Sequence, residues 1–172
     1  MEGLLHVYTG NGKGKSTAAI GLAVRCAGSG QKVLYTQFLK SDDSCELKVL
    51  EDIENICLLR CEKCFGFTFQ MTEEVKKAAK IFYTEHFRKV IARIEEYRLL
   101  VLDELVTAYG AEVIDRELVL DFLKSRPEGL EIVLTGRGAV PELMEMADYV
   151  SEIKKIKHPF DRGVGARMGI EK

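Results

Sequence analysis

The sequence lacks an apolar run long enough to cross a membrane, and Met1-Glu2-Gly3 begins neither a basic nor an apolar export-signal region. It also lacks an excess of charge of one sign, because the net charge is −2 and the pI is about 6.0. A balanced surface gives no overall attraction to nucleic acid or to an anionic membrane. We therefore expect a cytoplasmic protein that binds neither nucleic acids nor membranes.

Metal-binding and nucleophilic residue patterns are also scarce. Five cysteines, an odd number without an export signal, indicate reduced thiols rather than a disulfide framework. The spacing Cys57-x₃-Cys61-x₂-Cys64 resembles that of an iron–sulfur site, and its last two cysteines could supply half of a zinc site. However, Cys57 falls in a predicted strand and the other cysteines are distant in sequence, so we expect no metal there. The histidines show no mutual metal spacing, and no serine, histidine and acid pattern indicates covalent hydrolysis.

Nothing in the sequence divides the chain. It has 172 residues, of which 47% are hydrophobic, and it contains no internal repeat, linker or low-complexity tract. This length and composition suit one domain with a full core. We predict that residues 1–172 form a single domain.

The most informative stretch is a glycine-rich segment that follows an apolar run and leads into an alanine-rich helix start. Alternate glycines permit positive φ and direct successive N–H groups to one concave side, and the helix N-terminus adds partial positive charge. Lys15, expected to be exposed, adds a full charge, and the Ser16 hydroxyl can contact a divalent metal on the same phosphates. The usual G-x-x-x-x-G-K-[ST] pattern has glycine where Thr9 stands, so this loop is one residue short. The pattern favours a nucleotide phosphate-binding loop over a glycine turn with chance lysines, and its residues are Thr9, Gly10, Asn11, Gly12, Lys13, Gly14, Lys15, Ser16 and Thr17.

Apolar strand-like runs alternate with helix-like segments along the chain. Strand, helix and strand within the first 40 residues form a βαβ unit, which implies a parallel sheet. We predict an α/β fold of the P-loop NTPase (RecA-like) type, a three-layer sandwich around a mostly parallel sheet. The expected strands are 4–8, 32–39, 56–60, 99–102, 131–135 and 149–157. The expected helices run from the loop to residue 28 and over 45–50, 72–97, 115–124 and 141–146. Helix N-caps are expected at 42–44, Thr72 and Asp115.

Charged residues follow two of the predicted buried strands. Asp103 and Glu104 close the run Leu99–Leu102, the form in which this class of site holds Mg²⁺ opposite the loop hydroxyl. The strand at 131–135 delivers Arg137 to the same edge. Arg137 could neutralise phosphate charge or could pair with Glu104, and the residues alone leave both open.

An aromatic segment lies in the irregular region 61–71. Phe65, Phe67 and Phe69 are spaced two apart, so an extended backbone would place all three on one side as ordinary core. Their position in a loop favours instead a surface that receives a large, flat, apolar ligand.

Motifs throughout the chain carry a family resemblance. They are the loop region 8–19, Gln37-Phe38, Gly66-Phe67-Thr68, Leu102-Asp103-Glu104-Leu105, Arg126-Pro127, Leu134 to Gly138, Ala147-Asp148, and the tail segments 157–161 and 169–171. Together they resemble the ATP:corrinoid adenosyltransferase family, in its P-loop branch. The short loop and the C-terminal tail are specific to that family, and the resemblance covers essentially the whole chain.

The resemblance implies that the Co(I) centre of a reduced corrinoid attacks C5′ of ATP and displaces triphosphate. ATP would lie in the loop in the reverse of the usual sense. The loop residues, Arg137 and Arg25 would bind the nucleotide, and Lys15 and Glu104 would act in catalysis. Ser16 and Glu104 would flank Mg²⁺ or Mn²⁺. Phe67 and Phe69 would displace the lower cobalt ligand, although the second aromatic of that pair is usually Trp in the family.

The implied partners are an electron donor such as a flavoprotein and a second copy of the chain in a homodimer. A P-loop ATPase or small-molecule kinase with ordinary ATP polarity is the alternative enzyme. A non-catalytic corrinoid carrier is the alternative from another class.

Overall fold

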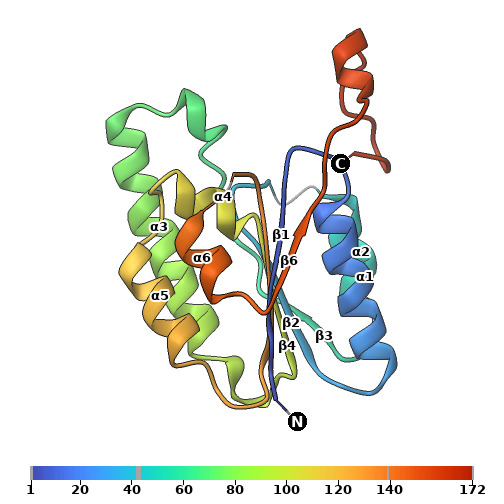
Figure 1. Cartoon of the computed structure of the whole chain (residues 1–172), viewed down its shortest axis with the longest axis vertical. Coiled ribbons are helices and arrows are strands. Elements are labelled where there is room, and N and C mark those ends of the chain that lie inside the picture. Colours follow the sequence, from blue (N-terminus) through green and yellow to red (C-terminus); the bar gives the residue numbers. More distant parts are fainter. Residues whose placement is uncertain (1, 42–43, 139, 172) are drawn as a thin grey trace.

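The computed structural model describes residues 2–41, 44–138 and 140–171. Within these residues, six strands form one parallel sheet with the order β3-β2-β4-β5-β1-β6 (Figure 1). The strands are β1 (Leu5–Thr9), β2 (Val33–Gln37), β3 (Ile56–Leu58), β4 (Leu99–Asp103), β5 (Glu131–Thr135) and β6 (Tyr149–Glu152). The predicted parallel sheet is confirmed.

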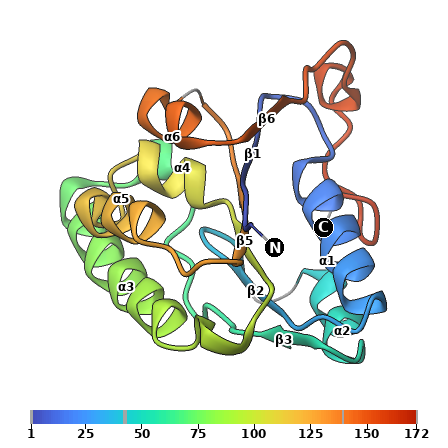
Figure 2. The same ribbon diagram turned by 60° about the horizontal axis from the view of Figure 1, so that its bottom comes forward.

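Helices cover both faces of the sheet. The pair α1 (Lys15–Gly28) and α2 (Cys45–Glu51) lies on one face (Figures 1 and 2). The other face carries α3 (Glu73–Ile91), α4 (Leu105–Gly110), α5 (Arg116–Lys124) and α6 (Pro141–Met146). This is the predicted three-layer α/β sandwich.

Strand β4 shows why the central sequence runs are apolar throughout. Leu100 and Leu102 point into the core beneath α3, whereas Leu99 and Val101 point into the core beneath α1. Successive side chains of a strand face opposite sides, so a strand covered by helices on both faces needs an apolar residue at every position. Edge strand β6, by contrast, is exposed at all four residues.

Helix ends follow the capping chemistry of the sequence in part. The Thr72 hydroxyl accepts from the Val75 N–H at 3.4 Å, and the Asp115 carboxylate accepts from the Leu118 N–H at 3.1 Å, as predicted. The predicted cap on Asp42 and Asp43 lies outside the described residues. Ser44 occupies the N-cap position of α2, but its side chain makes no capping hydrogen bond within the described part of the chain.

Two predicted element ends were wrong by several residues. Strand β6 ends at Glu152 rather than at Lys157. Helix α3 ends at Ile91 rather than near Tyr97, because the Arg93 N–H bonds to Val90 three residues back and a 3₁₀ turn, Ile94–Glu96, follows. The short helix α4 was also not predicted. It follows β4 after a single residue, Glu104, and no side chain of the described residues caps it. No helix in the described residues combines the length and apolarity needed to span a bilayer.

Candidate nucleotide site

The site lies where parallel strands end together. Strand β1 ends at Thr9, β2 at Gln37, β4 at Asp103 and β5 at Thr135. These four strands are neighbours through parallel pairing, so their last residues meet at the carboxyl edge of the sheet. Helix α1 begins at Lys15, directly behind the glycine loop.

The loop backbone matches the prediction at two of its three glycines. Gly10 and Gly14 have φ values of 101° and 121°, in the region that favours glycine. Gly12 does not have positive φ; its N–H donates to the Ile153 carbonyl at 2.7 Å, and a Cβ there would lie 2.7 Å from that oxygen. The expectation that every loop glycine serves positive φ was therefore wrong, because close approach of the chain after β6 is what requires Gly12.

The chain after β6 holds the loop at a second point. The Lys155 N–H donates to the Asn11 side-chain oxygen at 3.0 Å. Together with the bond from Gly12 to Ile153, this contact fixes the loop against residues 153–155, which we call the clamp segment. In Figure 1 the tail beyond this segment projects outward and returns to end near the start of α1.

Thr9, the residue that stands in place of a glycine, is buried at the end of β1. Its hydroxyl donates to the Gly138 carbonyl at 2.7 Å, which joins the start of the loop to the segment after β5. Threonine at this position therefore gives the loop a side-chain hydrogen bond that glycine cannot make.

Lys15 is buried rather than exposed, with 7% of its surface accessible. Its ammonium donates to the Gly12 carbonyl at 2.7 Å. Burial lowers the pKa of Lys15, and the carboxylate of Glu104 opposes that shift. The N–H groups of the first turn of α1 lack intrahelical acceptors, since the first such bond runs from the Ala18 N–H to the Gly14 carbonyl. Both features suit an anion above the loop.

The second acid of the predicted pair, Glu104, has left-handed backbone geometry with φ of 62°. Its carboxylate accepts from the Thr107 hydroxyl at 2.7 Å, and its N–H donates to the Thr135 hydroxyl at 2.9 Å. Arg137 is exposed and its N–H also donates to the Thr107 hydroxyl, at 2.8 Å. Among the ion pairs of the described residues, none joins Arg137 to Glu104.

The first acid, Asp103, is fully buried and held on both oxygens. Thr135 donates to Oδ1 at 2.6 Å, and the Lys40 ammonium donates to Oδ2 at 2.5 Å. The same ammonium donates to the Ser16 hydroxyl at 3.0 Å. Burial alone lowers the pKa of Lys40, but the ion pair with Asp103 outweighs it and the pKa is raised.

These contacts provide a test of whether the residues fit a divalent metal. Ser16 Oγ and Asp103 Oδ2 contact one ammonium group, so they border a single cation position, and both are the hard oxygen donors that Mg²⁺ prefers. The residues fit. The carboxylate that shares this position with Ser16 is that of Asp103, whereas the family resemblance implies Glu104 as the metal ligand. The Glu104 carboxylate here accepts from the Thr107 hydroxyl.

The aromatic segment divides into two parts. Phe67 and Phe69 are 69% and 80% exposed and stack on each other with ring centroids 5.4 Å apart. Phe65 turns inward and contacts Phe82 and Tyr83. A 3₁₀ turn, Thr68–Gln70, follows Phe67, so the segment is not extended and does not place all three rings on one side.

Two further candidates lie apart from the loop. Arg25 sits in the last turn of α1, ten residues beyond Lys15 and therefore about 15 Å along the helix axis. Cys57 lies in β3, Cys61 is buried and Cys64 is exposed, and none of the five cysteines forms a disulfide. Across the described residues, no group of three or more His, Cys, Asp or Glu side chains is arranged to hold a metal.

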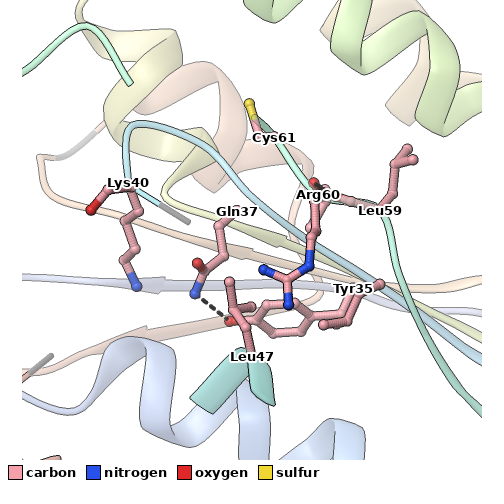
Figure 3. Close-up of a pocket in the computed structure, with 10 residues that line it drawn as sticks. Tyr35, Gln37, Lys40, Leu47, Leu59, Arg60 and Cys61 are labelled. Atoms are coloured by element: carbon pink, nitrogen blue, oxygen red, sulfur yellow. Dashed lines mark hydrogen bonds between the residues drawn. The ribbon is translucent and has the colours of Figure 1, made fainter. Parts of the chain in front are cut away.

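Gln37, Lys40 and Thr135 are site residues that no sequence motif indicated as such. Gln37 and Lys40 line a small hollow of about 10 Å³ beside the site, and Figure 3 shows both extending to the same side, away from Cys61. The available signal was their position, because each lies at or just after the carboxyl end of a strand. A larger hollow of about 640 Å³ lies at the opposite edge of the sheet, and none of the predicted site residues lines it.

Comparisons with known proteins agree with this geometry. Residues 1–171 match the family described as ATP:corrinoid adenosyltransferase BtuR/CobO/CobP. The chain is 36% identical to the corrinoid adenosyltransferase CobA of Salmonella typhimurium over 174 residues, covering 99% of this chain and 86% of that protein. It is 34% identical to the corrinoid adenosyltransferase of Pseudomonas aeruginosa over 178 residues, covering 99% and 84%.

Among solved structures, a KaiC-like protein from Pyrococcus horikoshii OT3 superposes with a TM-score of 0.57 at 16% identity, covering 89% of this chain and 72% of that chain. Identity this low shows the fold alone, which is the predicted RecA-like arrangement. The whole-length family match decides the finer assignment: the chain belongs to the ATP:corrinoid adenosyltransferase family.

Proposed function

We propose that this protein transfers the 5′-deoxyadenosyl group of ATP to the Co(I) centre of a reduced corrinoid. The observation that carries the proposal is the match of residues 1–171 to the ATP:corrinoid adenosyltransferase family. A glycine loop with a buried lysine behind it and two exposed, stacked phenylalanines support the same reaction.

In this reaction the cobalt electron pair forms the Co–C5′ bond, and the C5′–O bond breaks with its electron pair leaving on triphosphate. The protein needs no nucleophile of its own. Its tasks are to hold C5′ in line and to stabilise the negative charge on the leaving group. Lys15, the first turn of α1 and Arg137 would supply positive charge to the triphosphate.

A divalent metal would neutralise further phosphate charge when bound. Ser16 and Asp103 would hold it, with Glu104 as the neighbouring acid. Loop residues from Thr9 to Thr17 would orient the phosphates so that the ribose faces the corrinoid. Arg25 would contact the nucleotide away from the phosphates, a role inferred from its matching position alone.

The stacked pair Phe67 and Phe69 would form the corrinoid wall. An apolar surface offers cobalt no axial donor, so removing the lower ligand eases reduction of cobalt(II) to cobalt(I). We also propose a homodimer in the cytoplasm, with residues 1–172 acting as one domain and a separate protein, such as a flavoprotein, supplying the electron.

The test is an absorbance assay with chemically reduced cobalamin, ATP and Mg²⁺, followed by phosphate product analysis. The expected result is the spectrum of a cobalt–carbon bond with release of intact triphosphate, and no product without ATP. Release of ADP would support the kinase or ATPase alternative. Tight corrinoid binding without turnover would support the carrier.

A further inference from the structure

Lys40 occupies a constrained position beside the glycine loop. It follows Phe38, which is fully buried and whose N–H donates to the Asp103 carbonyl at 2.8 Å. Leu39 between them has φ of 59°, a left-handed geometry that is uncommon for a branched residue. This turn returns Lys40 over the edge of the sheet, with only about a quarter of its side chain exposed. Backbone strain of this kind persists only where the surroundings hold it.

The Lys40 ammonium links α1 and β4 through side-chain hydrogen bonds at the carboxyl edge of the sheet. It donates to Ser16 in the first turn of α1 and to Asp103 at the end of β4. Asp103 is fully buried, so its charge needs a close countercharge, and Lys40 supplies it. The ammonium therefore lies at the same oxygens that would hold a divalent metal.

We propose that Lys40 is a positioning residue that fills the cation position between Ser16 and Asp103 until the nucleotide arrives with its divalent metal. This inference rests on the proposed function, since it takes the site to be one for a metal–triphosphate complex. A divalent ion alone must displace an ammonium that is already paired with Asp103, and the displaced ammonium then loses its ion-pair partner. A triphosphate supplies that partner, so the metal enters together with the nucleotide.

The experiment titrates Mn²⁺ into the full chain without corrinoid and measures free Mn²⁺ by electron paramagnetic resonance. Without nucleotide, the unmodified protein should bind Mn²⁺ only weakly, and added ATP should produce a tight ternary complex. Lys40→Met should bind Mn²⁺ without nucleotide at least roughly tenfold more tightly than the unmodified protein, because a unit charge has left the site. Lys40→Arg should restore the exclusion of the metal.

The control is the double variant Lys40→Met with Asp103→Asn, which keeps the site neutral and should lose the nucleotide-free Mn²⁺ binding. Equal Mn²⁺ affinity in the unmodified protein and in Lys40→Met would overturn the proposal. If Lys40→Met fails to fold, Mn²⁺ binding to the unmodified protein tests the proposal instead. Tight Mn²⁺ binding without ATP would overturn it. Because no corrinoid is present, this Mn²⁺ measurement does not depend on adenosyl transfer. Failure of this proposal can therefore be distinguished from failure of the proposed function.

Discussion

At the scale of single residues, the buried Lys15 ammonium donates a hydrogen bond to the Gly12 carbonyl of the loop. Replacing Lys15 with Ala should lower adenosyl transfer by at least roughly 100-fold, because the leaving triphosphate loses a charge held in place by the fold. Stability should fall by about 1 kcal/mol, the usual net worth of one hydrogen bond. Steady-state turnover and thermal unfolding measure the two effects.

Lys154 offers a matched control, since it is an exposed lysine in the clamp segment that pairs with Glu152 at 3.4 Å. Lys154→Ala makes the same change of charge beside the loop and should leave turnover within roughly twofold, because an exposed pair is screened by solvent. Normal turnover in Lys15→Ala would remove Lys15 from the mechanism.

At the scale of elements, the aromatic segment contains one ring that packs against the fold, Phe65, and a second ring four residues later that is exposed, Phe69. Phe65→Ala should lower the free energy of unfolding by about 2 kcal/mol, less than for a full core phenylalanine because the ring is half-buried against Phe82 and Tyr83. Phe69→Ala should leave stability unchanged, because its ring is 80% exposed. Denaturant unfolding compares the two variants.

The activity of Phe69→Ala should depend on how cobalt is supplied. Turnover that starts from cobalt(II) and a reductant should fall more than turnover with pre-reduced cobalt(I), because the apolar wall acts on the reduction step. An equal loss in both assays would refute the ligand-displacement role of this pair.

The glycine loop and the clamp segment form one unit at this scale. Gly12→Ala would place a Cβ 2.7 Å from the Ile153 carbonyl oxygen and 2.8 Å from the Lys154 carbonyl carbon, both backbone atoms. We expect ATP affinity to fall roughly tenfold or more and stability to fall by about 1–3 kcal/mol, because the loop or the clamp must shift.

Gly21 in α1 is the matched control for this change. It is exposed, and a Cβ there meets no atom within 4 Å. Gly21→Ala should therefore stabilise the protein by about 1 kcal/mol through helix propensity and leave ATP binding unchanged. If Gly12→Ala binds ATP as the unmodified protein does, the clamp does not position the loop.

At the scale of the whole molecule, periodicity and turn chemistry in the sequence predict the sheet, most helices and the loop. Strands such as Leu99–Asp103 are apolar throughout, and Thr72 and Asp115 mark their helices by capping chemistry. These signals are local, so the sequence alone carries them.

The contacts that tie Lys40 to Asp103 and Gly12 to Ile153 join residues 63 and 141 positions apart. No local pattern encodes which strand ends become neighbours, because that depends on the strand order of the finished sheet. The burial of Lys15 and the ion pair of Lys40 with Asp103 were missed for this reason.

His86 connects the helical layer to the sheet and should give global stability a pH dependence. Its Nε2 lies 2.7 Å from the Thr36 hydroxyl of β2, and burial, with a smaller effect of Lys89, lowers its pKa from 6.5 to about 4. The folded protein therefore holds His86 neutral where the unfolded chain binds a proton. Its contribution is complete above pH 6.5 and is lost as pH falls toward 4, by about 3 kcal/mol.

Urea unfolding across this pH range measures the loss, and His86→Asn serves as the reference because it cannot titrate but has a similar polar side chain. Carboxylates titrate over the same range in both proteins, so the informative quantity is the difference between the two stability curves. The unmodified protein should lose stability more steeply than His86→Asn, by the linkage of about one proton per molecule in the middle of the range, between the two pKa values. Parallel curves would mean that His86 is protonated equally in the folded and unfolded chains, and that burial does not hold the ring neutral.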